Sequence, residues 1–260
     1  MQASDNYEGK VVLITGGTKG IGIGIAQGFL SAGATVIVCG RKEVEQLPQA
    51  PFKGVTQTAR FIQADVKDLE SITTMFTTIE QDYGKLDVLV NNAGGAPFAL
   101  ADQASPRFHE AILKLNLIAP LNVAQQANQI MQANGGGTIV FISSISAMRA
   151  SPGTAAYGAA KAGILSLVKT LAVEWAPKVR VVAVSPGLVQ TESSHLHYGD
   201  DDGIAAVSAT IPAGRMAQPQ DIANACMFLA SEQASYSSGC NLLLNGGGEM
   251  PAFLNAGNDK

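Results

Sequence analysis

The sequence has little of what several kinds of site require. It contains only three cysteines, three histidines and one tryptophan among 260 residues. Cys39, Cys226 and Cys240 have no metal-ligand spacing, and no Cys or carboxylate stands near the histidines at a suitable spacing, so we expect no metal site. Cysteines within apolar runs are typical of small buried side chains in a reducing compartment.

Long apolar runs and blocks of like charge are also missing. No apolar run approaches the roughly 18 residues that a membrane-spanning helix needs, and the polar stretch 1–10 has no apolar signal region. The formal net charge is −4 and the basic residues are scattered, which argues against a nucleic-acid-binding surface. We therefore expect a cytoplasmic protein that binds neither membranes nor nucleic acid.

Two patterns alternate along the chain. Short, nearly all-apolar runs predict strands covered on both faces, at 10–15, 35–39, 60–63, 87–90, 137–142, 179–184 and 241–244. Stretches with helical spacing lie between them, at 21–32, 69–82, 106–133, 155–175 and 220–230. This alternation predicts an α/β protein, a single-domain doubly wound Rossmann fold over residues 1–260, with about seven parallel strands and helices on both faces.

The polar segment 191–214 carries no clear pattern. It follows a predicted strand, where the ligand-binding loops of open α/β sheets lie, and it contains Gly203 and a run of three aspartates at 200–202. We expect a substrate lid here. Whether His195 and His197 in this segment touch substrate stays open, whereas His109 is expected on the surface.

A glycine-rich turn joins the first predicted strand to the first predicted helix. Its glycines are Gly16, Gly20 and Gly22, and glycine allows both a sharp turn and a close approach to phosphate. The helix that follows offers free N–H groups and a positive dipole end. A turn of this kind can be purely structural, but its position between strand and helix favours binding of a dinucleotide pyrophosphate.

Tyr157 and Lys161 lie four positions apart in a helical stretch and therefore share one face. Such a pair alone is a weak signal, but Ser144 ends a predicted strand and can return to the start of this helix. A tyrosine with its usual pKa of about 10 is a poor base at neutral pH. A nearby ammonium favours the phenolate and lowers that pKa. The three residues thus form a plausible acid/base site for an alcohol or ketone.

With these motifs, essentially the whole chain resembles the short-chain dehydrogenase/reductase family. The resemblance rests on the glycine-rich turn, on Asn91–Gly94 (sequence NNAG), on the four residues Asn116, Ser144, Tyr157 and Lys161, and on Pro186-Gly187 followed by Thr191. It implies that Tyr157 exchanges the proton, Ser144 polarises the substrate oxygen, Lys161 binds the nicotinamide ribose, and Asn116 holds a water of a proton relay. An amide at a helix kink is the alternative for Asn116.

The expected cofactor residues come from this resemblance and from the residues themselves. They are Gly16, Thr18, Lys19, Gly20, Ile21, Gly22, Arg41, Asp65, Val66, Asn92, Ala93, Gly94, Tyr157, Lys161, Pro186, Gly187, Val189 and Thr191. The resemblance assigns Asp65 and Val66 to the adenine, although Asp65 also stands where it could cap the next helix.

The end of the second predicted strand indicates which cofactor is preferred. Sites for NAD usually place an acidic residue here to bind the ribose hydroxyls, but this chain has Gly40 followed by Arg41. Arg41 and Lys19 are suited to a 2′-phosphate. We therefore expect NADP(H) to be preferred, with NAD(H) as the alternative, unless both cations are ordinary solvated residues.

The sequence predicts an enzyme that moves a hydride between NADP(H) and a secondary alcohol or ketone, with a moderately apolar cyclic or acyl substrate. A non-catalytic dinucleotide sensor is the alternative, but a sensor need not keep all four catalytic residues. An isomerase or dehydratase of the same broad fold is also disfavoured. Analogy with the family and the apolar helices at 106–133 and 155–175 favour a homotetramer, with the tail to residue 260 as a further contact. The substrate and the direction of reaction stay open.

Overall fold

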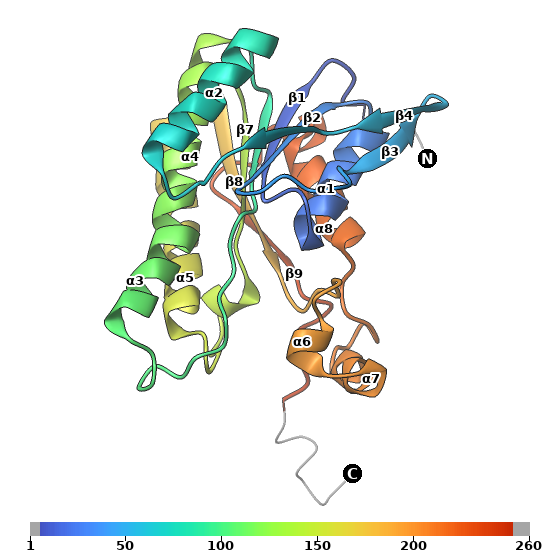
Figure 1. Cartoon of the computed structure of the whole chain (residues 1–260), viewed down its shortest axis with the longest axis vertical. Helices are drawn as coiled ribbons and strands as arrows, with labels where there is room; N and C mark the ends of the chain where they lie inside the picture. The colour runs from blue at the N-terminus through green and yellow to red at the C-terminus, as the bar shows by residue number, and fades with distance from the viewer. Residues whose placement is uncertain (1–5, 252–260) are drawn as a thin grey trace, which may run out of the picture.

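The computed structural model describes residues 6–251 of the chain (Figure 1). Seven strands form one sheet in the order β5-β2-β1-β6-β7-β8-β9, and every neighbouring pair is parallel. In chain order they are β1 (Val11–Thr15), β2 (Thr35–Gly40), β5 (Arg60–Gln63), β6 (Val88–Asn91), β7 (Gly137–Ile142), β8 (Val179–Pro186) and β9 (Asn241–Leu244). The predicted Rossmann fold is confirmed.

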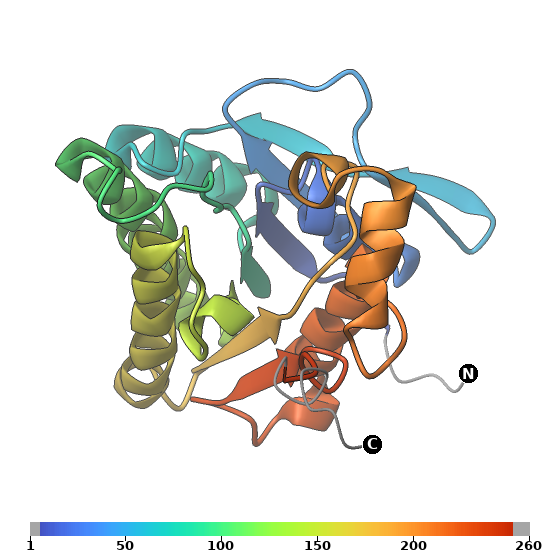
Figure 2. The ribbon, with the colours of Figure 1, turned by 90° about the horizontal axis from the view of Figure 1, so that it is seen from below.

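Helices cover both faces of this sheet (Figures 1 and 2). One face carries α2 (Leu69–Tyr83), α3 (Pro106–Leu113), α4 (Ala119–Ala133) and α5 (Ala155–Glu174). The other face carries α1 (Gly20–Ser31) and α8 (Pro219–Ala230). Shorter helical segments are η1 (Lys114–Ile118), η2 (Ile145–Ala147), α6 (His195–Tyr198), α7 (Asp201–Ala209) and η3 (Glu232–Ala234).

The two layers of helices create two hydrophobic cores, one on each side of the sheet. Successive side chains of a strand point to opposite faces, so Val11 and Leu13 of β1 enter the core beneath α2, α4 and α5. Val12 and Ile14 enter the core beneath α1 and α8. This is why the strand sequences are mostly apolar on both faces, and the central strands β1 and β6 are buried throughout.

The structure differs from the expected elements in three places. The helix predicted at 106–133 is interrupted by η1, a π-helical turn. An antiparallel hairpin, β3 (Gln49–Phe52) with β4 (Val55–Thr58), was not predicted and packs beside α1. The unassigned segment 191–214 contains α6 and α7, and the side chain of Asp200 caps α7 by accepting a hydrogen bond from the amide of Gly203 at 3.1 Å.

Helix α5 is long and apolar enough to cross a membrane by length and composition. It also contains Lys161 and Lys169, and Lys161 is buried against the sheet with 4% of its surface exposed. One such helix is weak evidence for a membrane span, because the core helix of a soluble protein passes the same test.

Candidate active site

A cleft of about 980 Å³ lies at the carboxyl ends of the central strands. The chain proceeds from β1 to β2 and β5 in one direction and resumes with β6 on the other side of β1, and ligands of open α/β sheets bind at such a reversal. The size is within the usual range for a small-molecule site. All the predicted site residues line this cleft except Gly22, Asn116 and Val189.

The glycine-rich turn brings the start of α1 to the wall of this cleft, where the local sequence supplies no cap. The residue before the helix, Lys19, makes no side-chain cap, and no acidic residue stands in the first turn. Gly20 has φ of +55°, a conformation that other residues rarely adopt. A Cβ on Gly22 would collide with the carbonyl oxygen of Gly16. The turn therefore needs glycine at both positions, and Gly22 allows its shape without itself lining the cleft.

The glycine-rich turn is held to the end of β6 by Thr15 and Asn92. The hydroxyl oxygen of Thr15 accepts hydrogen bonds from the amides of Asn92 and Ala93, both at 3.0 Å. In return, the Asn92 side-chain amide donates to the carbonyl oxygens of Thr15 at 3.0 Å and Gly16 at 3.1 Å. Thr15 is buried and was not predicted as a site residue. The sequence signal that could have identified it is a threonine at the end of a predicted strand.

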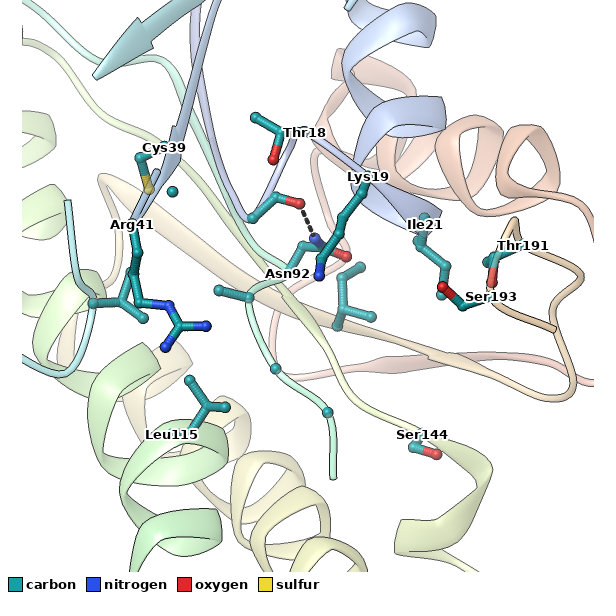
Figure 3. A pocket seen from close by; sticks show the side chains of 18 of the residues that line it. Thr18, Lys19, Ile21, Cys39, Arg41, Asn92, Leu115, Ser144, Thr191 and Ser193 are labelled. Atoms are coloured by element: carbon teal, nitrogen blue, oxygen red, sulfur yellow. Dashed lines mark hydrogen bonds between the residues drawn. The ribbon is translucent and has the colours of Figure 1, made fainter. Parts of the chain in front are cut away.

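The end of β2 gives the cleft a basic wall. Arg41 and Lys19 extend toward the same open space from different sides in Figure 3, and no carboxylate stands at Gly40. Cys39 also lines the cleft, but burial raises the pKa of its thiol to about 12, so it is a neutral thiol at physiological pH. Both cations expected for a 2′-phosphate thus line this cleft.

Asp65 and Val66 lie at the far side of this region, after β5. An oxygen of the Asp65 carboxylate accepts from the amide of Lys67 at 2.9 Å. The cap of α2 is Asp68, which accepts from the amide of Glu70 at 3.1 Å. Asp65 is therefore no helix cap, and it lines the cleft with Val66.

Ser144 and Tyr157 lie at the other end of the cleft, at the start of η2 and in the first turn of α5. The amide of Ser146 donates to Oγ of Ser144 at 3.1 Å. Burial raises the pKa of the Tyr157 phenol, and a hydrogen-bonding contact with Ser144 opposes part of that rise. The direction is opposite to the lowered pKa expected from the sequence, because Tyr157 is desolvated in the protein alone.

Lys161 is fixed beneath Tyr157. Its Nζ donates to the carbonyl oxygen of Ile142 at 2.8 Å and lies 5.5 Å from the centre of the Tyr157 ring. Burial lowers the pKa of Lys161 to about 8. The backbone of the same residue is held by the Ser143 hydroxyl, which donates to the Lys161 carbonyl oxygen at 3.0 Å. A large fraction of Lys161 is thus still ammonium at neutral pH.

Asn116 sits in the π-helical turn η1 and joins it to the loop after β6. Its Nδ2 donates to the carbonyl oxygens of Gly95 and Ile112, both at 3.0 Å, and its Oδ1 accepts from the amide of Gly95 at 2.8 Å. The residue is fully buried. π-helical turns are frequent at functional sites, and here the amide holds the loop that passes Lys161.

Some predicted positions lie elsewhere. Val189 packs against the core beneath α1 and α8, and it forms an isolated bridge with Ala217. His195 is exposed and does not line the cleft; the side chain of His197 and the tail 252–260 lie outside what the structure describes. Within residues 6–251, no group of three or more Cys, His, Asp or Glu side chains could hold a metal. The cleft also includes Glu192 and Leu115, which the motifs did not identify.

Comparisons with known proteins agree with this geometry. Residues 16–249 match the family model described as enoyl-(acyl carrier protein) reductase. The chain is 35% identical to 3alpha-hydroxysteroid dehydrogenase of Mediterraneibacter gnavus, over 91% of this chain and 96% of that protein. It is also 35% identical to 3-oxoacyl-[acyl-carrier-protein] reductase FabG of Escherichia coli, over 93% of this chain and 98% of that protein.

A solved structure has the same fold over nearly the whole chain. The ligand-free aldohexose dehydrogenase of Thermoplasma acidophilum superposes with a TM-score of 0.86 and 28% identity, and the match covers 94% of this chain and 96% of that one. These relatives act on different compounds, so they agree on the class of chemistry and differ on the substrate.

Proposed function

Since the chain belongs to the short-chain dehydrogenase/reductase family, we propose that it uses NADP(H) to interconvert a secondary alcohol and a ketone, with Tyr157 as the acid/base. The family resemblance expected from the motifs is confirmed, and the chain is an oxidoreductase for CH–OH or keto groups with NAD(P)(H). The observation that carries the proposal is that Ser144, Tyr157 and Lys161 share one cleft with the glycine-rich turn.

The hydrogen bonds support different roles for Ser144 and Tyr157 in the proposed reaction. Oγ of Ser144 accepts from the Ser146 amide and contacts the Tyr157 phenol, so the Ser144 hydroxyl lies beside Tyr157, where it would donate to the substrate oxygen. Tyr157 gives its phenolic proton to that oxygen during reduction and takes it back during oxidation. The bound nicotinamide supplies or accepts the hydride. Lys161, charged and held by Ile142, stabilises the phenolate.

The NADP(H) preference is proposed from the basic wall of the cleft. Arg41 and Lys19 project into it, and Gly40 leaves room where an acidic residue would repel a phosphate. One charge-assisted hydrogen bond contributes roughly 1.5–3 kcal/mol. That corresponds to a preference on the order of ten- to a hundredfold over NAD(H).

The proposed substrate is a moderately apolar cyclic or acyl ketone, or the corresponding alcohol. Phe98, on the loop after β6, and Met148, on the turn after Ser144, are 69% and 45% exposed. The Phe98 ring lies against Gly153, close before Tyr157 in the chain. Two of the relatives named above are a hydroxysteroid dehydrogenase and an oxoacyl reductase, which supports apolar candidates.

We also propose that the protein is a cytoplasmic homotetramer. Leu243 lies on β9, the edge strand of the sheet, and is 42% exposed, while Phe228 on the adjacent α8 is 45% exposed. Ile118 and Val173 on the other face are 46% and 78% exposed. An apolar sheet edge and apolar helix faces are typical of subunit contacts.

The test is a screen of purified protein against steroid, acyl-thioester, sugar and quinone substrates, each with NADPH and NADP⁺. We expect cofactor-dependent turnover with at least one apolar class. Calorimetry with NADPH alone accompanies the screen. A protein that binds NADPH but turns over no substrate in either direction would instead favour the dinucleotide sensor.

A further inference from the structure

A carboxylate from the segment after β8 occupies the open end of α1. An oxygen of Glu192 accepts a hydrogen bond from the backbone amide of Gly20 at 2.9 Å, and the two residues are 172 positions apart in the chain. Helix α1 has neither a side-chain cap nor an acidic residue of its own in the first turn. Glu192 therefore supplies an anion to a helix end that the local sequence leaves uncapped.

The position of Glu192 is set by a tight turn. The amide of Thr191 donates to Oγ of Ser194 at 2.8 Å, and the amide of Ser194 donates to the carbonyl oxygen of Thr191 at 3.0 Å. Ser194 is buried, with 3% of its surface exposed. The turn presents Glu192 to the glycine-rich turn, so the contact also ties the start of the proposed lid to the cofactor cleft.

The same helix end is the place where a dinucleotide pyrophosphate would bind. Amides at the start of a helix favour one anion there, and a second negative charge within a few ångströms repels the first. Gly20 can donate its single proton to the carboxylate or to a phosphate oxygen, but not fully to both. Binding of the cofactor and the Glu192–Gly20 contact are therefore in competition.

We propose that Glu192 is an internal competitor of the pyrophosphate, which holds the segment 191–198 against the glycine-rich turn until the cofactor displaces it. This inference rests on the proposed function, because it requires a dinucleotide at this turn. As a consequence, the Glu192 carboxylate weakens cofactor binding, and binding of the cofactor releases the start of the lid. The position of segment 191–198 thereby depends on whether the cofactor is bound.

The direct test is the variant Glu192→Gln, which keeps the shape and removes the charge. Calorimetry at low salt should give a Kd for NADPH about tenfold lower than in the wild type, equivalent to about 1.4 kcal/mol. The difference should shrink in 1 M salt, where exposed charges are screened. Hydrogen exchange of the free enzyme should also be faster across 191–198 in the variant.

Two matched controls test whether the change in Kd depends on the pyrophosphate and on the position of the carboxylate. Adenosine 2′-monophosphate carries the 2′-phosphate but no pyrophosphate, so its Kd should be the same for the wild type and Glu192→Gln. Glu110→Gln removes an exposed carboxylate on α3, outside the cleft, and should leave the Kd for NADPH unchanged.

The outcomes separate this inference from the proposed function. If Glu192→Gln binds NADPH within twofold of the wild type at low salt, Glu192 is no competitor, while the oxidoreductase proposal stands. An equal gain for adenosine 2′-monophosphate would also overturn the competition with pyrophosphate. If neither protein binds NADPH, both proposals fail.

Discussion

The amide of Ser146 donates to Oγ of Ser144 at 3.1 Å, two residues away in the same turn. This bond holds the Ser144 oxygen in place, while its proton can still turn about the Cβ–Oγ bond toward a partner. Ser146 is itself held, since its hydroxyl lies 3.1 Å from that of Ser151, which in turn contacts the Thr154 hydroxyl at 2.8 Å. The substrate oxygen would thus meet a donor whose oxygen is held in place beside Tyr157.

Replacing Tyr157 by Phe should abolish turnover while leaving the Kd for NADPH within about threefold. The change removes the proton-transfer group and little else. Steady-state rates and calorimetry measure the two effects. Tyr236→Phe is a matched control, since Tyr236 is fully exposed. Retention by Tyr157→Phe of more than a few per cent of the wild-type rate would assign the acid/base elsewhere.

The pH profile should differ between the two directions of reaction. Burial raises the pKa of Tyr157, so the phenol is protonated at neutral pH, as reduction requires. Oxidation requires the phenolate, whose fraction rises about tenfold per pH unit below the pKa. We expect kcat/KM for alcohol oxidation to rise between pH 6 and 8 while kcat/KM for ketone reduction stays level. A level oxidation profile would contradict the role of Tyr157.

Arg41→Ala should reduce the ratio of kcat/KM with NADPH to that with NADH by on the order of ten- to a hundredfold, because a charge-assisted bond to the 2′-phosphate is lost. Arg107→Ala on α3 removes an equal charge outside the cleft and should not change the ratio. A wild-type enzyme that uses NADH equally well would remove the basis for the NADP(H) preference.

Thr15→Val should lower the free energy of unfolding by about 1–3 kcal/mol and weaken NADPH binding. The substitution keeps the shape but leaves the amides of Asn92 and Ala93 without their acceptor. Chemical denaturation and calorimetry measure both. Thr77→Val, whose hydroxyl bonds only within α2 on an exposed face, is the control. Unchanged cofactor affinity in Thr15→Val would mean that this link does not shape the cofactor turn.

Light scattering at micromolar concentration should give the mass of a tetramer. Leu243→Lys places a charge on the exposed edge strand β9 and should shift the protein to smaller species. Leu69→Lys, at the exposed start of α2, should not. A wild-type protein that is a monomer at this concentration would contradict the proposed tetramer.

The seven strands of the sheet and the glycine-rich turn followed from the sequence, because apolar strands and turn glycines are local signals, and most of the other cleft residues followed from the family resemblance. The pKa of Tyr157 did not, since its direction depends on desolvation by residues distant in the chain. The contact between Glu192 and Gly20 spans 172 positions, and no local pattern encodes it. The hairpin β3–β4 was missed because its second strand is polar and exposed and its first contains Pro51.

Helix α7 was missed for a different reason. The aspartates at 200–202 look like loop residues, yet Asp200 is an N-cap and the next two acids stand in the first turn of the helix. Acidic residues at a helix start are stabilised by the helix dipole. The signal was present, but the short, weakly apolar helix that follows gave it no support.

The π-helical turn η1 has a consequence for insertions and deletions in this part of the chain. A π-helical turn closes i→i+5 hydrogen bonds where a regular α-helix closes bonds four residues apart, so it takes up one extra residue within about one turn. Removing one residue from Lys114–Ile118 would therefore regularise the helix with little rotation of α3 relative to α4, whose buried face is fixed by the sheet. The same deletion would rotate the side chains inside the turn, so it would change where Asn116 can reach while Ile112 keeps its neighbours.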